Sequence, residues 1–179
     1  VKKYYKPEDL EDEDSYDEFF LSLYDKIGDN DKFLKFSKEK GFSTERIKKL
    51  IQIGRFEEAL KECEKQKEFS EEIENMKIEL LKRFGKKQEA KDSLLNLANE
   101  TENIGYVKKL KKECDKNEWR LYLQKLIANA LKNNWKAFVS RIYFNEEDYK
   151  NAYEYSKGMS ETDYLELLAR KLSKDYPEN

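Results

Sequence analysis

The chain has 179 residues, which is enough for one domain or one continuous repeat array. Its 36 basic and 38 acidic residues nearly balance, which excludes a globally basic nucleic-acid binder. Histidine is absent, which removes the commonest general base and the commonest metal ligand. Twelve tyrosines, ten phenylalanines and two tryptophans can fill a core, so the high proportion of charged residues does not indicate disorder. Few prolines and glycines favour long helices over a sheet rich in turns.

The cysteines, Cys63 and Cys114, lie far apart without metal-binding spacing, so we expect a reducing, cytoplasmic location and no metal or other cofactor. Both hold apolar positions of helices and are expected to be buried structural residues. No apolar run approaches the roughly 20 residues that span a bilayer, which predicts that no membrane partner is involved. The chain begins at Val1, so a fragment of a longer protein is expected.

Residues 1–14 contain an acidic run after Pro7 and are predicted to be a linker or tail. A docking strip or a mimic of nucleic-acid charge is the alternative for this segment. A single helical-repeat domain is predicted for residues 15–179. Apolar residues at helical spacing, separated by capping residues and glycines, place its hairpins at about 15–41, 43–67, 70–100, 102–133 and 135–158, with a terminal helix at 160–175. The helix that Asn117-Glu118-Trp119 opens is the most apolar and is expected at the middle of the core.

Four predicted helix starts, at Gly54, Gly85, Asn117 and Glu147, are separated by 31, 32 and 30 residues. A period in the low thirties with two amphipathic helices per unit is typical of helical solenoids. The predicted fold class is therefore all-α, a right-handed superhelical array of helical hairpins with about eleven helices.

Five positions after these starts stand Ala59, Ala90, Tyr122 and Ala152, three of them small enough for close helix approach. In the helix that begins at Gly54, the helical spacing predicts that Phe56, Ala59 and Leu60 are buried and that Glu57 and Glu58 are exposed.

The stretch Gly54–Leu60 resembles the second-helix start of tetratricopeptide repeats, in which a glycine, an aromatic residue and an alanine hold the places of Gly54, Phe56 and Ala59. The preceding helix departs from that family, because Ser43 and Ile47 stand where the family has an aromatic residue and a glycine. The resemblance implies a stack of hairpins that holds a protein or peptide.

Residues 146–153, 163–170 and 176–179 resemble the helical region beyond SWIM zinc fingers of prokaryotic proteins, over roughly residues 43–179. That resemblance implies a C-terminal fragment whose missing part carries a nucleic-acid-related role. Zinc does not carry over to this chain, because the Cys and His pattern of the finger is absent.

The predicted function is a non-catalytic scaffold that binds a protein or peptide on its concave face. The candidate contact residues are aromatic, and Tyr106 and Tyr155 are expected to lie off the main apolar faces of their helices. The four candidates are Tyr106, Tyr143, Tyr153 and Tyr155. Tyrosines exposed singly are common without any function, which is the plainer interpretation.

The alternative function is a nucleic-acid-associated region that uses the basic surface of residues 83–112. Its candidate phosphate-binding residues are Arg83, Lys86, Lys87, Lys108, Lys109, Lys111 and Lys112. The same lysines around Leu110 are also what the solvated face of a helix looks like. An enzyme is the weakest hypothesis, because no histidine, phosphate-binding loop or metal-ligand spacing is present.

Overall fold

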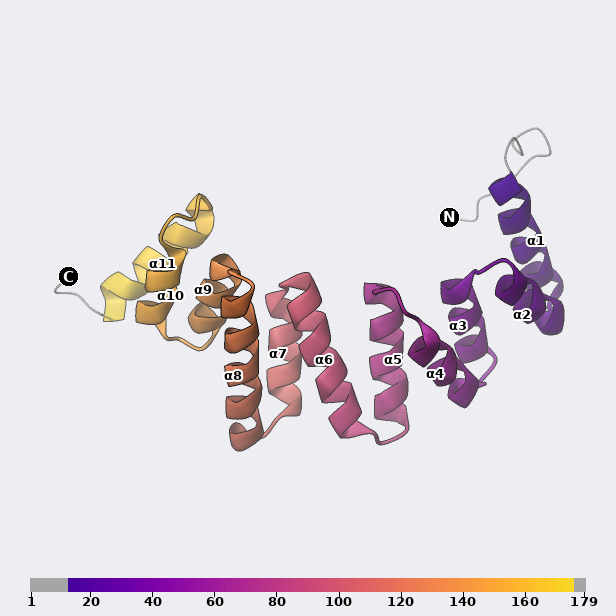
Figure 1. Ribbon diagram of the computed structural model, residues 1–179, viewed down its shortest axis with the longest axis horizontal. Helices are drawn as coiled ribbons and strands as arrows, with labels where there is room; N and C mark the ends of the chain where they lie inside the picture. The colour runs from indigo at the N-terminus through magenta and orange to yellow at the C-terminus, as the bar shows by residue number, and fades with distance from the viewer. Residues whose placement is uncertain (1–12, 176–179) are drawn as a thin grey trace. The chain divides into compact units, whose positions relative to one another are not determined.

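The computed structural model describes residues 13–175, and within them the chain forms eleven helices and no strand (Figure 1). The all-α prediction is confirmed, whereas a superhelical course of the hairpins stays a prediction. The helices are α1 (Glu13–Ile27), α2 (Asn30–Glu39), α3 (Ser43–Gln52), α4 (Phe56–Lys65), α5 (Glu71–Arg83), α6 (Lys87–Thr101), α7 (Ile104–Glu113), α8 (Lys116–Lys132), α9 (Lys136–Asn145), α10 (Tyr149–Ser156) and α11 (Thr162–Asp175).

The chain divides into two compact units, the first ending at Gly85 and the second beginning at Lys86. In the first unit each of α1 to α4 packs against the next helix in the chain. In the second unit α9 and α10 pack most extensively. The two helices within the predicted hairpin at 70–100, α5 and α6, belong to separate units. The predicted tail at 1–14 lies outside the described residues up to position 12, and α1 already begins at Glu13.

Tight turns with one left-handed residue follow most of the described helices, although not α4 or α7. After α3, the Arg55 amide donates to the Leu50 carbonyl at 2.8 Å and the Gly54 amide donates to Ile51 at 3.1 Å. This is the Schellman arrangement, which requires the positive φ of 79° at Gly54. Asn134 and Glu147 hold the same place in the second unit at φ 60°, although neither is glycine. Ten-residue helices joined by such turns therefore put Gly28, Gly41 and Gly54 at a spacing of 13 residues.

The predicted equivalence of Asn117 with the other helix starts is wrong. Helices α4, α6 and α10 begin two residues after Gly54, Gly85 and Glu147, whereas Asn117 lies inside the first turn of α8. The reason is a capping box: the Asp115 side chain accepts from the Glu118 amide at 2.9 Å, and Glu118 accepts from the Asp115 amide at 3.0 Å. This box starts α8 three residues earlier than the alignment requires.

The apolar register of the alignment is correct even so. All four residues at the fifth position, Ala59, Ala90, Tyr122 and Ala152, are buried. Leu60 is buried and Glu57 is exposed, as predicted. Phe56 is half-buried beneath the Arg83 guanidinium, which lies 3.8 Å from the ring centroid.

Helix α8 does not bury all of its apolar side chains. A single stripe of it is buried, comprising Trp119, Tyr122, Leu126 and Ala130, while Leu121 and Leu131 are exposed. The expectation that this whole apolar helix lies in the middle of the core is therefore wrong. Hydrophobic content alone does not tell which sides of a helix are covered.

Candidate functional site

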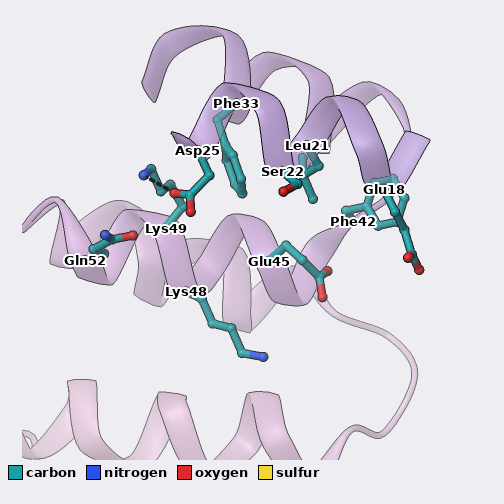
Figure 2. A pocket seen from close by; sticks show the side chains of 10 residues that line it. All are labelled: Glu18, Leu21, Ser22, Asp25, Phe33, Phe42, Glu45, Lys48, Lys49 and Gln52. Atoms are coloured by element: carbon teal, nitrogen blue, oxygen red, sulfur yellow. Dashed lines mark hydrogen bonds and ion pairs between the residues drawn. The ribbon is translucent and has the colours of Figure 1, made fainter. Parts of the chain in front are cut away.

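A groove of about 420 Å³ lies in the first unit, between one face of α1 and one face of α3 (Figure 2). Helix α1 contributes four residues at the spacing of a single helical face, Glu18, Leu21, Ser22 and Asp25. Phe33 of α2 and a set on α3 and its N-cap complete the lining, namely Phe42, Glu45, Lys48, Lys49 and Gln52. Figure 2 shows Leu21, Asp25 and Phe33 projecting toward the helix that carries Lys49.

A buried lysine closes one end of this groove. The side chain of Lys49 is only 6% exposed, and its ammonium donates to Oδ1 of Asp25 at 2.7 Å. The same ammonium lies 5.3 Å from the centroid of the Phe33 ring, within the range of a cation–π contact. These two contacts join α3 to α1 and to α2, so the groove is held by side chains from three helices.

The remaining charges give the groove an acidic character. Lys48 points away from the other lining side chains in Figure 2 and pairs with Glu72 of α5 at 2.6 Å. The side chain of Asp25 is 53% exposed although one of its oxygens is engaged by Lys49. The side chain of Glu45 makes no hydrogen bond or ion pair with another described residue. Carboxylates beside the apolar side chains of Leu21 and Phe33 suit a ligand that has both a cationic and an apolar part.

The tyrosines singled out from the sequence do not form one surface. Tyr106 is buried in α7, so the expectation that it lies off the apolar face of its helix is wrong. Tyr143 and Tyr155 are half-buried and stack on each other, with ring centroids 5.7 Å apart. Burial raises the pKa of the Tyr143 hydroxyl, and Tyr155 and Asp148 add to that shift. Tyr153 is exposed, with the Lys157 ammonium 5.4 Å from its ring.

The basic residues of the alternative site are also divided. Arg83 belongs to the first unit, whereas the six lysines from Lys86 to Lys112 belong to the second. Lys86 pairs with Glu89 at 3.2 Å, and Lys111 pairs with Glu146 at 2.9 Å.

The other four lysines of that set, Lys87, Lys108, Lys109 and Lys112, are exposed. Lys109 lies with its ammonium 4.8 Å from the Tyr106 ring. Two of the six lysines are thus already neutralised by carboxylates, which lowers their value for phosphate binding.

Both cysteines are thiols without a disulfide partner. Burial raises the pKa of Cys63 to about 12 and also raises the pKa of Cys114, so neither side chain is a thiolate at neutral pH. Cys63 is buried as expected, whereas Cys114 is only partly buried, because it lies at the C-cap of α7, beyond the last helical residue. Among residues 13–175 no group of three or more acidic or cysteine side chains is placed to hold a metal ion. In the same residues no helix is both long and apolar enough to cross a membrane.

Sequence reasoning missed the groove because its residues are not periodic in hydrophobicity. Of the four α1 residues that line it, only Leu21 is apolar. The one available signal was the 18, 21, 22, 25 spacing, which places two carboxylates on the face of α1 that also carries Leu21.

Comparison with known proteins adds no further assignment. No family model, no curated protein and no solved structure matches this chain.

Proposed function

We propose that the chain is a non-catalytic helical scaffold that binds a peptide segment of a partner protein in the groove between α1 and α3. The observation that carries this proposal is the lining of the groove, in which apolar side chains and carboxylates face the same space. A groove of about 420 Å³ is at the small end of the range for ligand sites and has room for one or a few side chains of a peptide. The partner would therefore be recognised through one anchoring residue and its neighbours.

The chemistry of the lining favours a basic anchoring residue. A lysine or arginine has an aliphatic stem, which packs against Leu21, Phe33 and Phe42, and a cationic head, which bonds to Glu45 and to the second oxygen of Asp25. Lys49 does not repel this head strongly, because its ammonium is buried and already paired. An acidic side chain would meet the carboxylates and would be excluded.

A peptide array tests this proposal, in which one central position carries lysine, arginine, glutamate, leucine or alanine. We expect the soluble form of a captured lysine or arginine peptide to bind Glu45→Gln about tenfold more weakly than the unaltered chain, because a charge-assisted hydrogen bond is lost. Glu57→Gln is the matched control, since Glu57 is an exposed carboxylate of α4 in the same unit. Equal binding by the unaltered chain and Glu45→Gln would refute the groove as the site.

The same purified chain can be used to test the alternative function, binding of nucleic acid. If the chain bound an oligonucleotide with a steep salt dependence and bound none of the peptides, the basic surface of residues 83–112 would replace the groove as the proposed site.

A further inference from the structure

A second pocket adjoins the groove at the N-terminal end of α3. It has a volume of about 390 Å³ and lies between the first turn of α3 and the connection from α4 to α5. Phe42 and Glu45 line both the groove and this pocket, so the two spaces share a wall. Figure 2 shows Phe42 at one end of the groove and Gln52 at the other. A peptide that leaves the groove at its Phe42 end therefore reaches the second pocket.

The walls of the second pocket are formed by contacts within the chain. Helix α3 packs against α5, and the Lys48 ammonium pairs with Glu72 across these two helices at 2.6 Å. The Ser70 hydroxyl caps α5 by accepting from an amide of its first turn at 3.4 Å. The Gln66 side chain donates to the Glu62 carbonyl at 3.0 Å. A site whose walls are fixed before binding loses little conformational entropy when a ligand enters.

Apolar side chains from three elements line the second pocket. Phe69 lies in the connection between α4 and α5, outside any helix, and is 50% exposed. Phe42, at the N-cap of α3, is half-buried, and Ile73 of α5 is buried. A ligand side chain in the pocket would cover part of the Phe69 ring that is now open to water, which favours a large apolar residue.

The charges of the second pocket select against other kinds of side chain. The described residues that line it include two carboxylates, Glu45 and Glu68, and no lysine or arginine. An acidic side chain would be repelled. A basic side chain would share Glu45 with the basic residue held in the groove, and two cations on either side of one carboxylate repel each other. A large apolar side chain meets neither difficulty.

On the basis of the groove as the peptide site, we propose that the partner peptide carries two anchors: the basic residue in the groove and a large apolar residue in the second pocket. Pockets of about 420 and 390 Å³ are each about 7 Å across if they are roughly cubic, so the two anchors enter them about 7 Å apart. An extended chain rises about 3.3 Å per residue and points alternate side chains to opposite sides. The anchors are therefore expected two residues apart in the peptide.

The test uses synthetic peptides and the full chain. Each peptide carries a central lysine and one phenylalanine, placed one, two or three residues before or after the lysine in an otherwise uncharged background. Companion peptides replace the phenylalanine with alanine or glutamate, or the lysine with alanine. We expect phenylalanine two residues from the lysine, on one side of it, to raise the affinity about tenfold over alanine. Phenylalanine one or three residues away should give no such gain, and glutamate should lower the affinity.

Two substitutions locate the gain. Phe69 is 50% exposed and Leu121 of α8 is 61% exposed, so Phe69→Gln and Leu121→Gln both remove exposed apolar surface. We expect Phe69→Gln to abolish the gain from phenylalanine without changing the affinity for the alanine peptide, and Leu121→Gln to change neither affinity. Both variants should keep the circular dichroism spectrum of the parent, because both side chains are exposed. If Phe69→Gln did not fold, the comparison of phenylalanine with alanine on the unaltered chain would still decide.

Three results would overturn the proposal. The first is equal affinity for the phenylalanine and alanine peptides at every spacing. The second is a gain from phenylalanine that does not depend on its spacing or that persists in Phe69→Gln. Both leave the groove proposal standing, provided that lysine still binds more tightly than alanine at the central position. The third is a gain from phenylalanine without that preference for lysine, which would refute the groove and the two-anchor ligand together.

Discussion

Glu146, at the C-terminal end of α9, joins three helices of the second unit and is the residue whose removal is most informative. One of its carboxylate oxygens accepts from the Lys111 ammonium at 2.9 Å, and the other accepts from the Trp119 indole at 3.0 Å. Its side chain is 17% exposed, whereas that of Lys111 is 42% exposed. The two contacts are therefore expected to contribute unequally.

The magnitudes follow from that difference in exposure. The ion pair with Lys111 is open to water and is worth at most about 1 kcal/mol. The buried indole of Trp119 would lose its acceptor, which costs about 1–3 kcal/mol for an unsatisfied donor. We therefore expect Glu146→Ala to lower the free energy of unfolding by about 2–3 kcal/mol. Lys111→Met should lower it by less than about 1 kcal/mol.

Denaturant unfolding monitored by circular dichroism measures these values, and the fluorescence of Trp119 reports the loss of its hydrogen bond. In the Trp119→Phe background no indole donor remains, so Glu146→Ala should cost about 1–2 kcal/mol less than it does in the parent. If Lys111→Met cost as much as Glu146→Ala, or if the cost of Glu146→Ala were the same in both backgrounds, the indole contact would not be the main contribution of Glu146.

Three further predictions concern the core, pH dependence and thiol reactivity. Ala59→Glu should destabilise the first unit by at least about 3 kcal/mol, because it forces a charge into a position with no exposed surface, and thermal melting measures this. The Lys91 ammonium lowers the pKa of the Glu118 carboxyl below its usual 4.5, so the stability from this pair is present above pH 4.5 and is lost as the pH falls through the lowered value. In Glu118→Gln the free energy of unfolding should therefore fall less steeply as the solution is acidified. Cys63, with its pKa raised to about 12 and its side chain buried, should resist alkylation at neutral pH until the chain unfolds, whereas the partly exposed Cys114 should react sooner.

Each of these three predictions has a result that would contradict it. A melting temperature of Ala59→Glu equal to that of the parent would show that the inter-helix contact at Ala59 is not as described. If the stability of Glu118→Gln fell with acid as steeply as that of the parent, the pair with Lys91 would not be the cause of the acid dependence. Alkylation of Cys63 as fast as Cys114 in the folded chain would mean that α4 opens readily.

The helices themselves follow from local sequence features. Ser70 and Asp29 cap helices as their residue types predict, with the Ser70 hydroxyl accepting from the Ile73 amide at 3.4 Å and Asp29 accepting from Lys32 at 3.1 Å. Apolar residues at helical spacing also predict the buried fifth positions, such as Ala59 and Ala152. These features act within one helix, so no knowledge of the neighbours is needed to find them.

The sequence could not place residues whose surroundings come from another helix. Tyr106 was expected off the apolar face of α7, but α6 and α9 pack around that helix and the side chain is buried together with Val107 and Leu110. Lys49 lies next to the core residue Leu50 with no sign that its charge would be buried. It is buried because Asp25, 24 residues earlier, supplies the opposite charge from α1.

By itself, the sequence determined that this protein is all-helical and approximately where its helices lie, because those properties depend on caps and on a spacing of 3.6 residues. The tertiary structure alone decided the division into two units at Gly85 and the groove between α1 and α3. It also decided which tyrosines are exposed. These properties depend on which helix covers which face, and side chains far apart in the chain settle that choice.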